Sequence, residues 1–593
     1  MAGGLQPQIT ANCSRIFPKT VRLSEWIVIA GRIEYSQAMT FSLRPLVVIC
    51  LSLLIWISAP AATHDRTPPQ FATNPTVTRN PNPRVPLASI VTFRSDKPAA
   101  VALQINDGRV FYADRELQTE HAVAILGLHA AGRNQVRIFL IDAAGNRSAP
   151  SVSMEILTDP LPADFPPIEA RVHQTLRMEP GVTLFNIIRT DRGLSALLAV
   201  DGEGKVVWYY RGDAMITDAR RLRNGNLLFL DGTDAVEMDM LGNVVRKWRP
   251  LRLGTAVDAS SAVPVDVDTF HHELAELPWR NLLTLSTEVR RYDAYPSSET
   301  DPRAPVSSAN VVGDVIVEFE RDGRVVNQWR LLDLLSPYRI GYDSLLGFWD
   351  LTYRNSFAGT RDWAHANAVS YDASDDSFIV SLRHQDAVVK IARRTSQIVW
   401  ILGTHNGWNA PQSSFLLQPA GRFEWPFHQH APEMTSRGTL LLFDNGNNRA
   451  EPFEPKMALE ESYSRAVEYR IDPRTRTVSQ TWSYGGPGDE MFFSRIIGEA
   501  DQLPLTKNIL ITDGARDLDA NGNNSESDSG TTQWARIVEV TYTQPAEKVL
   551  ELVIGDPSRL AIVGWLVYRS ERLPSLYPPD RIPTPPLRGK VPE

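Results

Sequence analysis

One phrase recurs along the chain and limits what it can fold into. Each copy has a turn, then β-branched residues, then an apolar or aromatic end. An apolar strand-like phrase such as RLRNGNLLFL (221–230) precedes most copies. Such runs predict short antiparallel strands, and one sheet of them cannot bury both of its faces. Six copies are present: DGEGKVVWYY (201–210), LGNVVRKW (241–248), DGRVVNQW (322–329), RTSQIVWILG (394–403), RTRTVSQTW (474–482) and AEKVLELVIG (546–555).

Stacking such sheets around an axis buries both faces of each. We therefore predict an all-β protein with a six-bladed β-propeller over residues 168–593. A seven-bladed propeller and a β-helix are the structural alternatives. The six copies favour six blades, and their spacing is much longer than the coils of a β-helix.

The part before the repeats shows a different pattern. Residues 62–85 are rich in proline, threonine and asparagine and are expected to form an exposed linker. Residues 86–160 contain five strand patterns about ten residues apart, separated by Gly, Asn and Asp turns. That spacing predicts a small immunoglobulin-like β-sandwich as an N-terminal domain.

The first 61 residues have the features of an export signal. Residues 46–58 form a 13-residue apolar run after Arg44, and Ala59-Pro60-Ala61 follows in a small-x-small cleavage pattern. We expect residues 1–61 to be a leader that contains a signal peptide, with Met39 as the true start. An uncleaved membrane anchor is the alternative, although the run is short for a membrane span. Cleavage predicts a periplasmic or secreted protein with no stable membrane insertion.

Composition excludes several kinds of chemistry. Cleavage after Ala61 removes both cysteines, Cys13 and Cys50, which excludes disulfides, thiolate metal sites and cysteine nucleophiles. The chain has 61 Lys and Arg against 69 Asp and Glu, for a net charge of −8. This acidic balance excludes nucleic acid as the main partner, because phosphate contacts require a basic surface. A homo-oligomer is compatible with the sequence.

Three histidines recur near the start of one strand in the repeat. His272 lies ten residues before Leu282 and His430 lies ten before Leu440, while His365 lies slightly further upstream of its strand. Inner strands line the channel of a propeller, so we expect these imidazoles to converge on the axis. His271 is not excluded in place of His272, because the two are adjacent.

Two more residues extend this group toward an anion site. Asn367 follows His365 by two residues, so on a strand it faces the same way. Arg383 begins a polar stretch after the next strand and can fork onto an oxyanion, although a surface arginine is the plain alternative. Imidazoles with arginine and asparagine suit a sulfate or phosphate group better than zinc. A neutral imidazole is also a competent nucleophile near neutral pH.

Three segments together resemble the bacterial arylsulfate sulfotransferases, which need no nucleotide sulfate donor: 270–277 (FHHELAEL), 362–408 and 427–449. The resemblance implies transfer of a sulfuryl group from an aryl sulfate donor to a phenolic acceptor, by ping-pong kinetics through a sulfohistidine. It implies His430 as the nucleophile. It also implies His365, Asn367 and Arg383 as the sulfuryl-binding set, with His272 as the match in the His-His segment and His271 as the other candidate.

Two further interpretations stay open. The acidic segment that ends in Asp528 matches part of a calcium loop without its bidentate glutamate, and a solvated polar loop is the alternative; its candidate ligands are Asp517, Asp519, Asn521 and Asp528. A bound calcium ion would be structural, and no other cofactor is expected. The alternative functions are a metal-dependent propeller hydrolase of the lactonase or esterase type and a non-catalytic periplasmic scaffold.

Overall fold

The computed structural model describes residues 65–253, 261–488, 490–526, 530–558 and 564–578. The expected leader, residues 1–61, lies outside these ranges. The regular secondary structure of the described part is almost entirely β-strand, as predicted, and its helices are short. The α-helices are α1 (Leu331–Leu334) and α2 (Asp350–Tyr353), and the 3-10 helices are η1 (Thr190–Arg192), η2 (Arg383–Gln385), η3 (Gln412–Phe415) and η4 (Leu459–Glu461). No helix of the described part is long and apolar enough to cross a membrane.

The N-terminal part is one five-stranded sheet that is built on two long strands, β2 and β3. Strand β2 pairs with β1 near its start and with β4 near its end, while β3 pairs along most of its length. Alternate side chains of these strands, such as Val91, Val101 and Ile138, form a buried core. The strands are β1 (Thr76–Arg79), β2 (Ser89–Ile105), β3 (Phe111–Ile125), β4 (Arg133–Asp142) and β5 (Met154–Leu157).

The expected linker, residues 62–85, is therefore not wholly a linker. Thr76 to Arg79 form β1, which pairs with β2 in antiparallel register. The proline-rich composition concealed this strand, because Thr76-Val77-Thr78 is a short β-branched run between prolines. Asn82 also donates a side-chain hydrogen bond to the main-chain oxygen of Gly242 (2.7 Å), so this segment contacts the later sheets.

Six sheets follow in the described residues, and each has four or five strands there. The first three in chain order are β33-β7-β8-β9, β10-β11-β12-β13-β14 and β15-β16-β17-β18 with β19 beside β17. Their strands are β7 (Val182–Arg189), β8 (Leu194–Val200), β9 (Val206–Arg211), β10 (Ile216–Arg221), β11 (Leu227–Asp231), β12 (Asp234–Met238), β13 (Val244–Pro250), β14 (Val263–Val265), β15 (His271–Glu276), β16 (Leu282–Tyr295), β17 (Ser307–Phe319), β18 (Val325–Arg330), β19 (Arg361–Asp362) and β33 (Ser570–Leu573).

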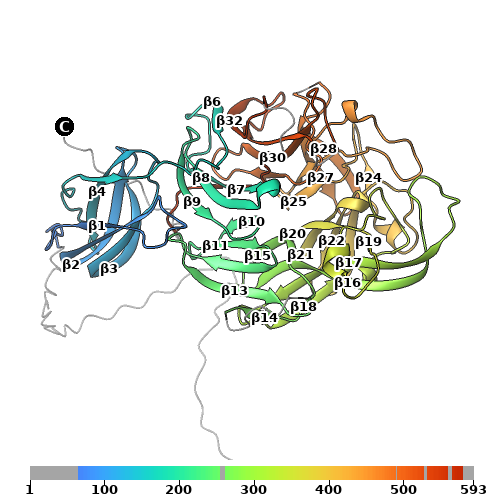
Figure 1. Cartoon of the computed structure of the whole chain (residues 1–593), viewed down its shortest axis with the longest axis horizontal. Coiled ribbons are helices and arrows are strands. Elements are labelled where there is room, and N and C mark those ends of the chain that lie inside the picture. Colours follow the sequence, from blue (N-terminus) through green and yellow to red (C-terminus); the bar gives the residue numbers. More distant parts are fainter. Residues whose placement is uncertain (1–64, 254–260, 489, 527–529, 559–563, 579–593) are drawn as a thin grey trace, which may run out of the picture. The chain divides into compact units, whose positions relative to one another are not determined.

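The other three sheets are β20-β21-β22-β23, β25-β26-β27-β28-β24 and β29-β30-β31-β32-β6. Strand β6 comes from the start of this region yet lies beside β32 from its end (Figure 1). Their strands are β6 (Ile168–His173), β20 (Ala366–Asp372), β21 (Ser377–Leu382), β22 (Ala387–Ala392), β23 (Ile398–Gly403), β24 (Gln418–Pro419), β25 (His430–Met434), β26 (Leu440–Asp444), β27 (Arg465–Asp472), β28 (Thr477–Gly485), β29 (Glu499–Gln502), β30 (Ile509–Leu518), β31 (Thr532–Val540) and β32 (Lys548–Ile554).

The sheets form a closed ring. The first strand of each sheet contacts the first strand of the next, from β10 through β15, β20 and β25 to β29, and β33 contacts both β10 and β30. Strand β33, from the end of the described chain, completes the sheet that begins with β7. The ring is therefore closed by pairing two segments that are distant in sequence, as in propellers.

The recurring phrase forms the fourth strand of every sheet in the ring: β9, β13, β18, β23, β28 and β32. Its tryptophans join neighbouring sheets. The indole of Trp248 donates to the main-chain oxygen of Arg321 (2.9 Å), and that of Trp329 donates to Arg393 (3.0 Å). Trp208 and Trp482 make the same type of bond. A buried indole needs such a partner, so these bonds fix how the sheets stack.

Ring closure predicts a position that tolerates only glycine. Gly181 precedes β7 at φ +137°, and an added Cβ would lie 2.0 Å from the main-chain oxygen of Leu573 in β33. Gly181→Ala should therefore lower the free energy of unfolding by about 3 kcal/mol, because β33 must move away.

The matched control is Gly145, at φ +83°, where an added Cβ would meet no other atom within 4 Å. Gly145→Ala carries only backbone strain, on the order of 1 kcal/mol. Thermal or denaturant unfolding of the two variants measures the difference. Equal losses of stability would contradict the role assigned to this closure.

Candidate functional site

The site begins at a bulge that recurs in the inner strands. The antiparallel register breaks after Thr217 in β10, after His271 in β15 and after His430 in β25. In each case the next residue has a positive φ angle: Asp218 (+47°), His272 (+59°) and Ala431 (+49°). Such left-handed non-glycine residues are strained and cluster at functional sites. The bulges turn polar side chains away from regular alternation at this end of the strands.

Strand register distinguishes the two adjacent histidines. His271 pairs with Leu285 and His430 pairs with Phe443, so register aligns His271, not His272, with His430. At the bulge, β15 advances by three residues while its partner β16 advances by one. In β25 the same three-residue advance opposes two residues of β26. Counting residues back from the following strand therefore pointed to His272. The extra bulged residue brings His272 to the imidazole of His365.

The imidazoles form a continuous chain across three sheets. Ring centroids are 5.1 Å apart for His271 and His272, and 4.8 Å apart for His272 and His365. The distance is 4.7 Å from His365 to His384 and 6.0 Å from His384 to His428. His365 and His272 are thus brought together as the repeat suggested, and they lie within a larger cluster.

His430 is held in one tautomer. Its Nδ1 lies 2.6 Å from the amide oxygen of Asn445, whose amide nitrogen donates to the main-chain oxygens of Ser494 and Ile497 (both 2.8 Å). Because that nitrogen is engaged twice, the amide oxygen must face His430, and Nδ1 must carry the proton. Burial and the charge of Arg383 hold the pKa of His430 well below its usual range. The ring is therefore neutral, with its lone pair on Nε2.

His365 has a carboxylate where His430 has an amide. Its Nδ1–H donates to Oδ2 of the buried Asp362 (2.6 Å), and the other oxygen of Asp362 accepts from the indole of Trp349 (3.0 Å). Burial acts to raise the pKa of Asp362, but the charges of His365 and His384 lower it overall. An ionised Asp362 therefore stabilises positive charge on His365.

Three of these groups are close enough to hold a metal ion: Asp362, His365 and His384. Their facing atoms are engaged otherwise. His384 Nδ1 donates to the main-chain oxygen of Asp362 (2.8 Å), so it carries a proton rather than a lone pair. His365 Nδ1 is bonded to the carboxylate of Asp362. These contacts favour a hydrogen-bonded carboxylate–imidazole cluster over a metal centre.

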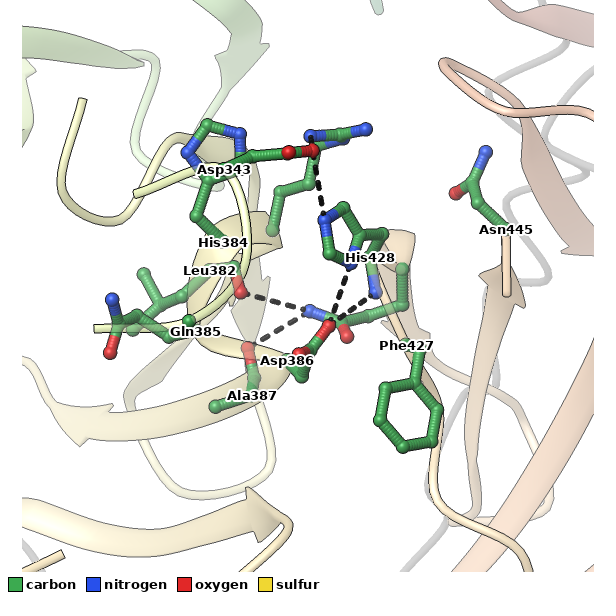
Figure 2. Close-up of polar contacts among 12 residues, drawn as sticks. Asp343, Leu382, His384, Gln385, Asp386, Ala387, Phe427, His428 and Asn445 are labelled. Carbon is green, nitrogen blue, oxygen red and sulfur yellow. Dashed lines mark hydrogen bonds and ion pairs between the residues drawn. The ribbon is translucent and has the colours of Figure 1, made fainter. Parts of the chain in front are cut away.

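Arg383 is positioned by a chain of charges that continues through Asp343, His428 and Asp386, all three of which are labelled in Figure 2. Its Nη1 lies 3.4 Å from Asp343 Oδ2, and its Nη2 lies 3.4 Å from the main-chain oxygen of Arg495. The same Asp343 oxygen is 3.2 Å from His428 Nε2, and Asp386 Oδ1 is 2.9 Å from His428 Nδ1. Burial acts against the charged form of His428, but Asp386 and Asp343 raise its pKa overall. His428 is thus a buried cation that orients the carboxylate bound to Arg383.

Asn367 supports the main chain of the site. It is fully buried, and its amide nitrogen donates to the main-chain oxygen of Gln429 (2.9 Å), the residue before His430. Behind it lies Arg569, which pairs with Asp218 (2.6 Å) and Glu273 (2.9 Å). These contacts tie three inner strands and the closing segment together beneath the imidazoles.

A cavity of about 310 Å³ opens among the inner strands. Arg220, Glu273, Glu433 and Glu499 line it, together with the turn that contains Pro278. None of the histidines of the cluster belongs to its lining. The imidazole cluster and this charged cavity are therefore separate features of the ring interior.

The suggested calcium ligands do not face one another within the described residues. Asp517 is buried and its carboxylate accepts from Arg495 Nε (2.8 Å). Asp519 accepts from the main-chain nitrogen of Asn521 in its own turn (2.8 Å). Asp528 lies outside the described residues. Calcium binding by this loop stays a prediction.

Comparison with known proteins places this arrangement in a family. The family model described as arylsulfotransferase (ASST) matches residues 169–555, which hold the strands of the ring except β33. The chain belongs to the arylsulfotransferase family. The resemblance noted in the sequence is thereby confirmed.

Two curated relatives are both called arylsulfate sulfotransferase AssT. The one from Escherichia coli O6:H1 (strain CFT073) is 31% identical over 355 residues, which cover 50% of this chain and 54% of the relative. The one from Lelliottia amnigena is 34% identical over 230 residues, which cover 32% of this chain and 37% of the relative. The chain thus matches about half the length of these relatives or less.

A solved structure of a putative 6-phosphogluconolactonase from Bacteroides fragilis is 8% identical and has a TM-score of 0.27. Its alignment covers 81% of this chain and 98% of the lactonase. A TM-score this low does not relate the two structures in detail.

Sequence reasoning missed the residues that tether the imidazoles. Asn445 lies in the FDNGNNR segment (443–449), whose Asn-Gly pair by itself indicates only a turn. Asp362 stands three residues before His365, and that spacing was the available signal for it. Asp343 and Arg569 are far from the motifs in sequence, so no local pattern identifies them.

The buried cation predicts a pH-dependent contribution to stability. Because the folded pKa of His428 is raised, its contribution is fully present below its unfolded pKa and disappears as pH rises through the folded value. His428→Gln should therefore cost more stability at about pH 5.5 than at about pH 9.

Denaturant unfolding of wild type and variant at both values measures this difference. His173→Gln, at an exposed position of β6, is the matched control and should change little at either pH. A cost for His428→Gln that grows with pH would contradict the assigned protonation state.

Proposed function

We propose that this protein moves a sulfuryl group from an aryl sulfate ester to a phenolic acceptor. His430 carries the group in between as a sulfohistidine, and no nucleotide sulfate donor takes part. The observation that carries the proposal is the tautomer of His430: a neutral imidazole with Nδ1–H fixed by Asn445 and a lone pair on Nε2. Family membership supports sulfuryl transfer as the reaction class.

The first half-reaction forms one bond and breaks one bond. His430 Nε2 attacks the sulfur, an N–S bond forms, the S–O bond to the aryl group breaks and the aryl oxygen leaves as a phenolate. The ring gains positive charge as it is sulfurylated, and the hydrogen bond from Nδ1–H to Asn445 strengthens as it does so. The second half-reaction is the reverse, with the oxygen of the acceptor phenol attacking the sulfur. Ping-pong kinetics follow from this order.

Arg383 and His365 supply positive charge for the sulfuryl oxygens. Arg383 is buried and preorganised by Asp343, and His365 is backed by Asp362. Fixed donors in a water-poor site stabilise a charge-rich transition state more strongly than solvent does. Asn367 contributes by holding the main chain next to His430.

His430→Ala should abolish transfer while leaving the fold intact, because the nucleophile is lost. Wild type incubated with 4-nitrophenyl sulfate and no acceptor should gain one sulfuryl mass on the peptide that contains residues 427–433. Peptide mass spectrometry at mildly alkaline pH, with transfer to phenol assayed in parallel, tests both results.

His173→Ala is the matched control, because His173 is exposed on β6 and should keep full activity. An active His430→Ala enzyme, or a sulfuryl group found on another residue, would overturn the assignment. Transfer that depends on added zinc would instead favour the metal-dependent hydrolase.

We also propose that the protein acts outside the cytoplasm. The support is the apolar run 46–58 followed by Ala59-Pro60-Ala61. Mass spectrometry of protein from the native cell should find an N-terminus near Ala62. An intact leader on protein recovered from the cytoplasmic fraction would contradict this location, and the sulfuryl-transfer proposal would stand independently.

A further inference from the structure

Two buried polar atoms behind His272 have no hydrogen-bond partner within the described part of the chain. They are Nε2 of His271 in β15 and Oδ2 of Asp314 in β17, the two strands on either side of β16 in one sheet. His271 Nε2 lies 3.8 Å from Asp314 Oδ1. An unsatisfied buried polar group is costly, so such a pair calls for an explanation such as a catalytic role.

The contact between the two histidines determines where their protons lie. Nδ1 of His271 and Nδ1 of His272 are 2.8 Å apart. A hydrogen bond between two ring nitrogens needs one proton on one side and a lone pair on the other. The three side chains in a row, Asp314, His271 and His272, therefore have two matched arrangements of their protons.

In the first arrangement Asp314 is a carboxylic acid facing bare Nε2 of His271. The Nδ1–H of His271 then donates to His272, and His272 carries its own proton on Nε2. In the second arrangement every proton has moved one place along: Asp314 is a carboxylate, His271 carries Nε2–H, and His272 donates through Nδ1 and has a lone pair on Nε2. The two arrangements differ by one proton released at His272 Nε2.

A ping-pong sulfuryl transfer needs a group that can release one proton and later take one back. The departing phenolate must take up a proton in the first half-reaction, because its conjugate acid has a pKa of about 10. The incoming phenol must give up a proton in the second. His430 can neither donate the first proton nor accept the second, because its Nδ1–H stays bonded to Asn445 and its Nε2 carries the sulfuryl group.

We propose that Asp314, His271 and His272 form a proton relay that serves both half-reactions. As the S–O bond breaks, the aryl oxygen takes the proton from His272 Nε2. His272 takes one from His271, and His271 takes one from Asp314. The acceptor phenol later returns one proton by the same path, so the protons balance over a full cycle. This proposal rests on the proposed function.

The placement of His272 suits this role. Its Nδ1 is engaged by His271, and its Nε2 forms no hydrogen bond within the described residues. Its ring lies against that of His365, and burial, aided by the positive charge of Arg569, holds the pKa of His272 well below its usual range. The inner end of the relay therefore meets the sulfuryl site.

The outer end of the relay is shielded from water. Burial, aided by the negative charge of Asp362, raises the pKa of Asp314 to about 8, so its carboxyl group holds a proton at neutral pH. Burial lowers the pKa of His271 to about 4, which keeps that ring neutral. Other groups that face the pair are the Trp349 ring, the hydroxyl of Tyr353, the main chains of Ser286 and Ala366 and the imidazole of His365.

Donors with different leaving groups provide the test. Phenyl sulfate needs a proton for its leaving oxygen, whereas 4-nitrophenyl sulfate releases a stable anion. In Asp314→Asn and in His271→Gln, kcat/KM for phenyl sulfate should fall about 100-fold, as for loss of a general acid. The same constant for 4-nitrophenyl sulfate should change less than about 3-fold. Asp268→Asn, a nearby carboxylate bonded to Tyr353, is the matched control and should affect the two donors alike.

Equal losses for both donors would assign these residues a purely structural role and overturn the relay. Unchanged rates for both would overturn it as well. If neither variant folds, the wild type decides: a relay gives a shallow dependence of kcat/KM on the pKa of the leaving phenol, and a steep dependence would contradict it. A wild type that transfers from no donor would instead overturn the proposed function.

Discussion

Each sheet of the ring has two apolar faces, and the rest of the structure depends on covering both. Side chains such as Leu197, Phe229 and Leu285 are fully buried between sheets, so no sheet is stable in isolation. The covering is complete only when the last sheet meets the first, which β33 achieves by pairing with β7. The tryptophan of the recurring phrase sets the spacing, because its indole must reach a main-chain oxygen of the next sheet.

Closure also creates the site. The inner strands of a ring meet around its axis, so polar side chains at one level of those strands are crowded whatever their separation in sequence. The bulges of β15 and β25 place His272 and His430 at that level, and Arg569 arrives there from the closing segment. Stability and site geometry therefore have one origin, and damage to the closure should disturb both.

The sequence was sufficient to predict the parts of the molecule that follow the repeat. It was not sufficient to predict the parts that do not. The repeat predicted the all-β ring and singled out His365 and His430, because register within a repeat converts spacing into position. The repeat aligned His272 rather than His271 with His430, because the bulge in β15 differs from the bulge in β25 and spacing then no longer gives the position. Neither Asn445 nor Arg569 was predicted from the sequence, because their importance comes from contacts between sheets. The strand at Thr76 was hidden by the prolines around it.

The partner of Nδ1 explains how chemically identical side chains acquire different roles. An amide oxygen at His430 fixes a neutral ring with a lone pair, which suits a nucleophile. A carboxylate at His365 stabilises a cation, which suits the binding of anionic oxygens. A second imidazole at His272 allows either protonation state at Nε2, which suits a group that must both give and take a proton. Burial makes these differences large, since no solvent competes for the same nitrogen atoms. The chemistry of the cluster is therefore set by the residues behind the histidines, and exchanging those residues should exchange the roles.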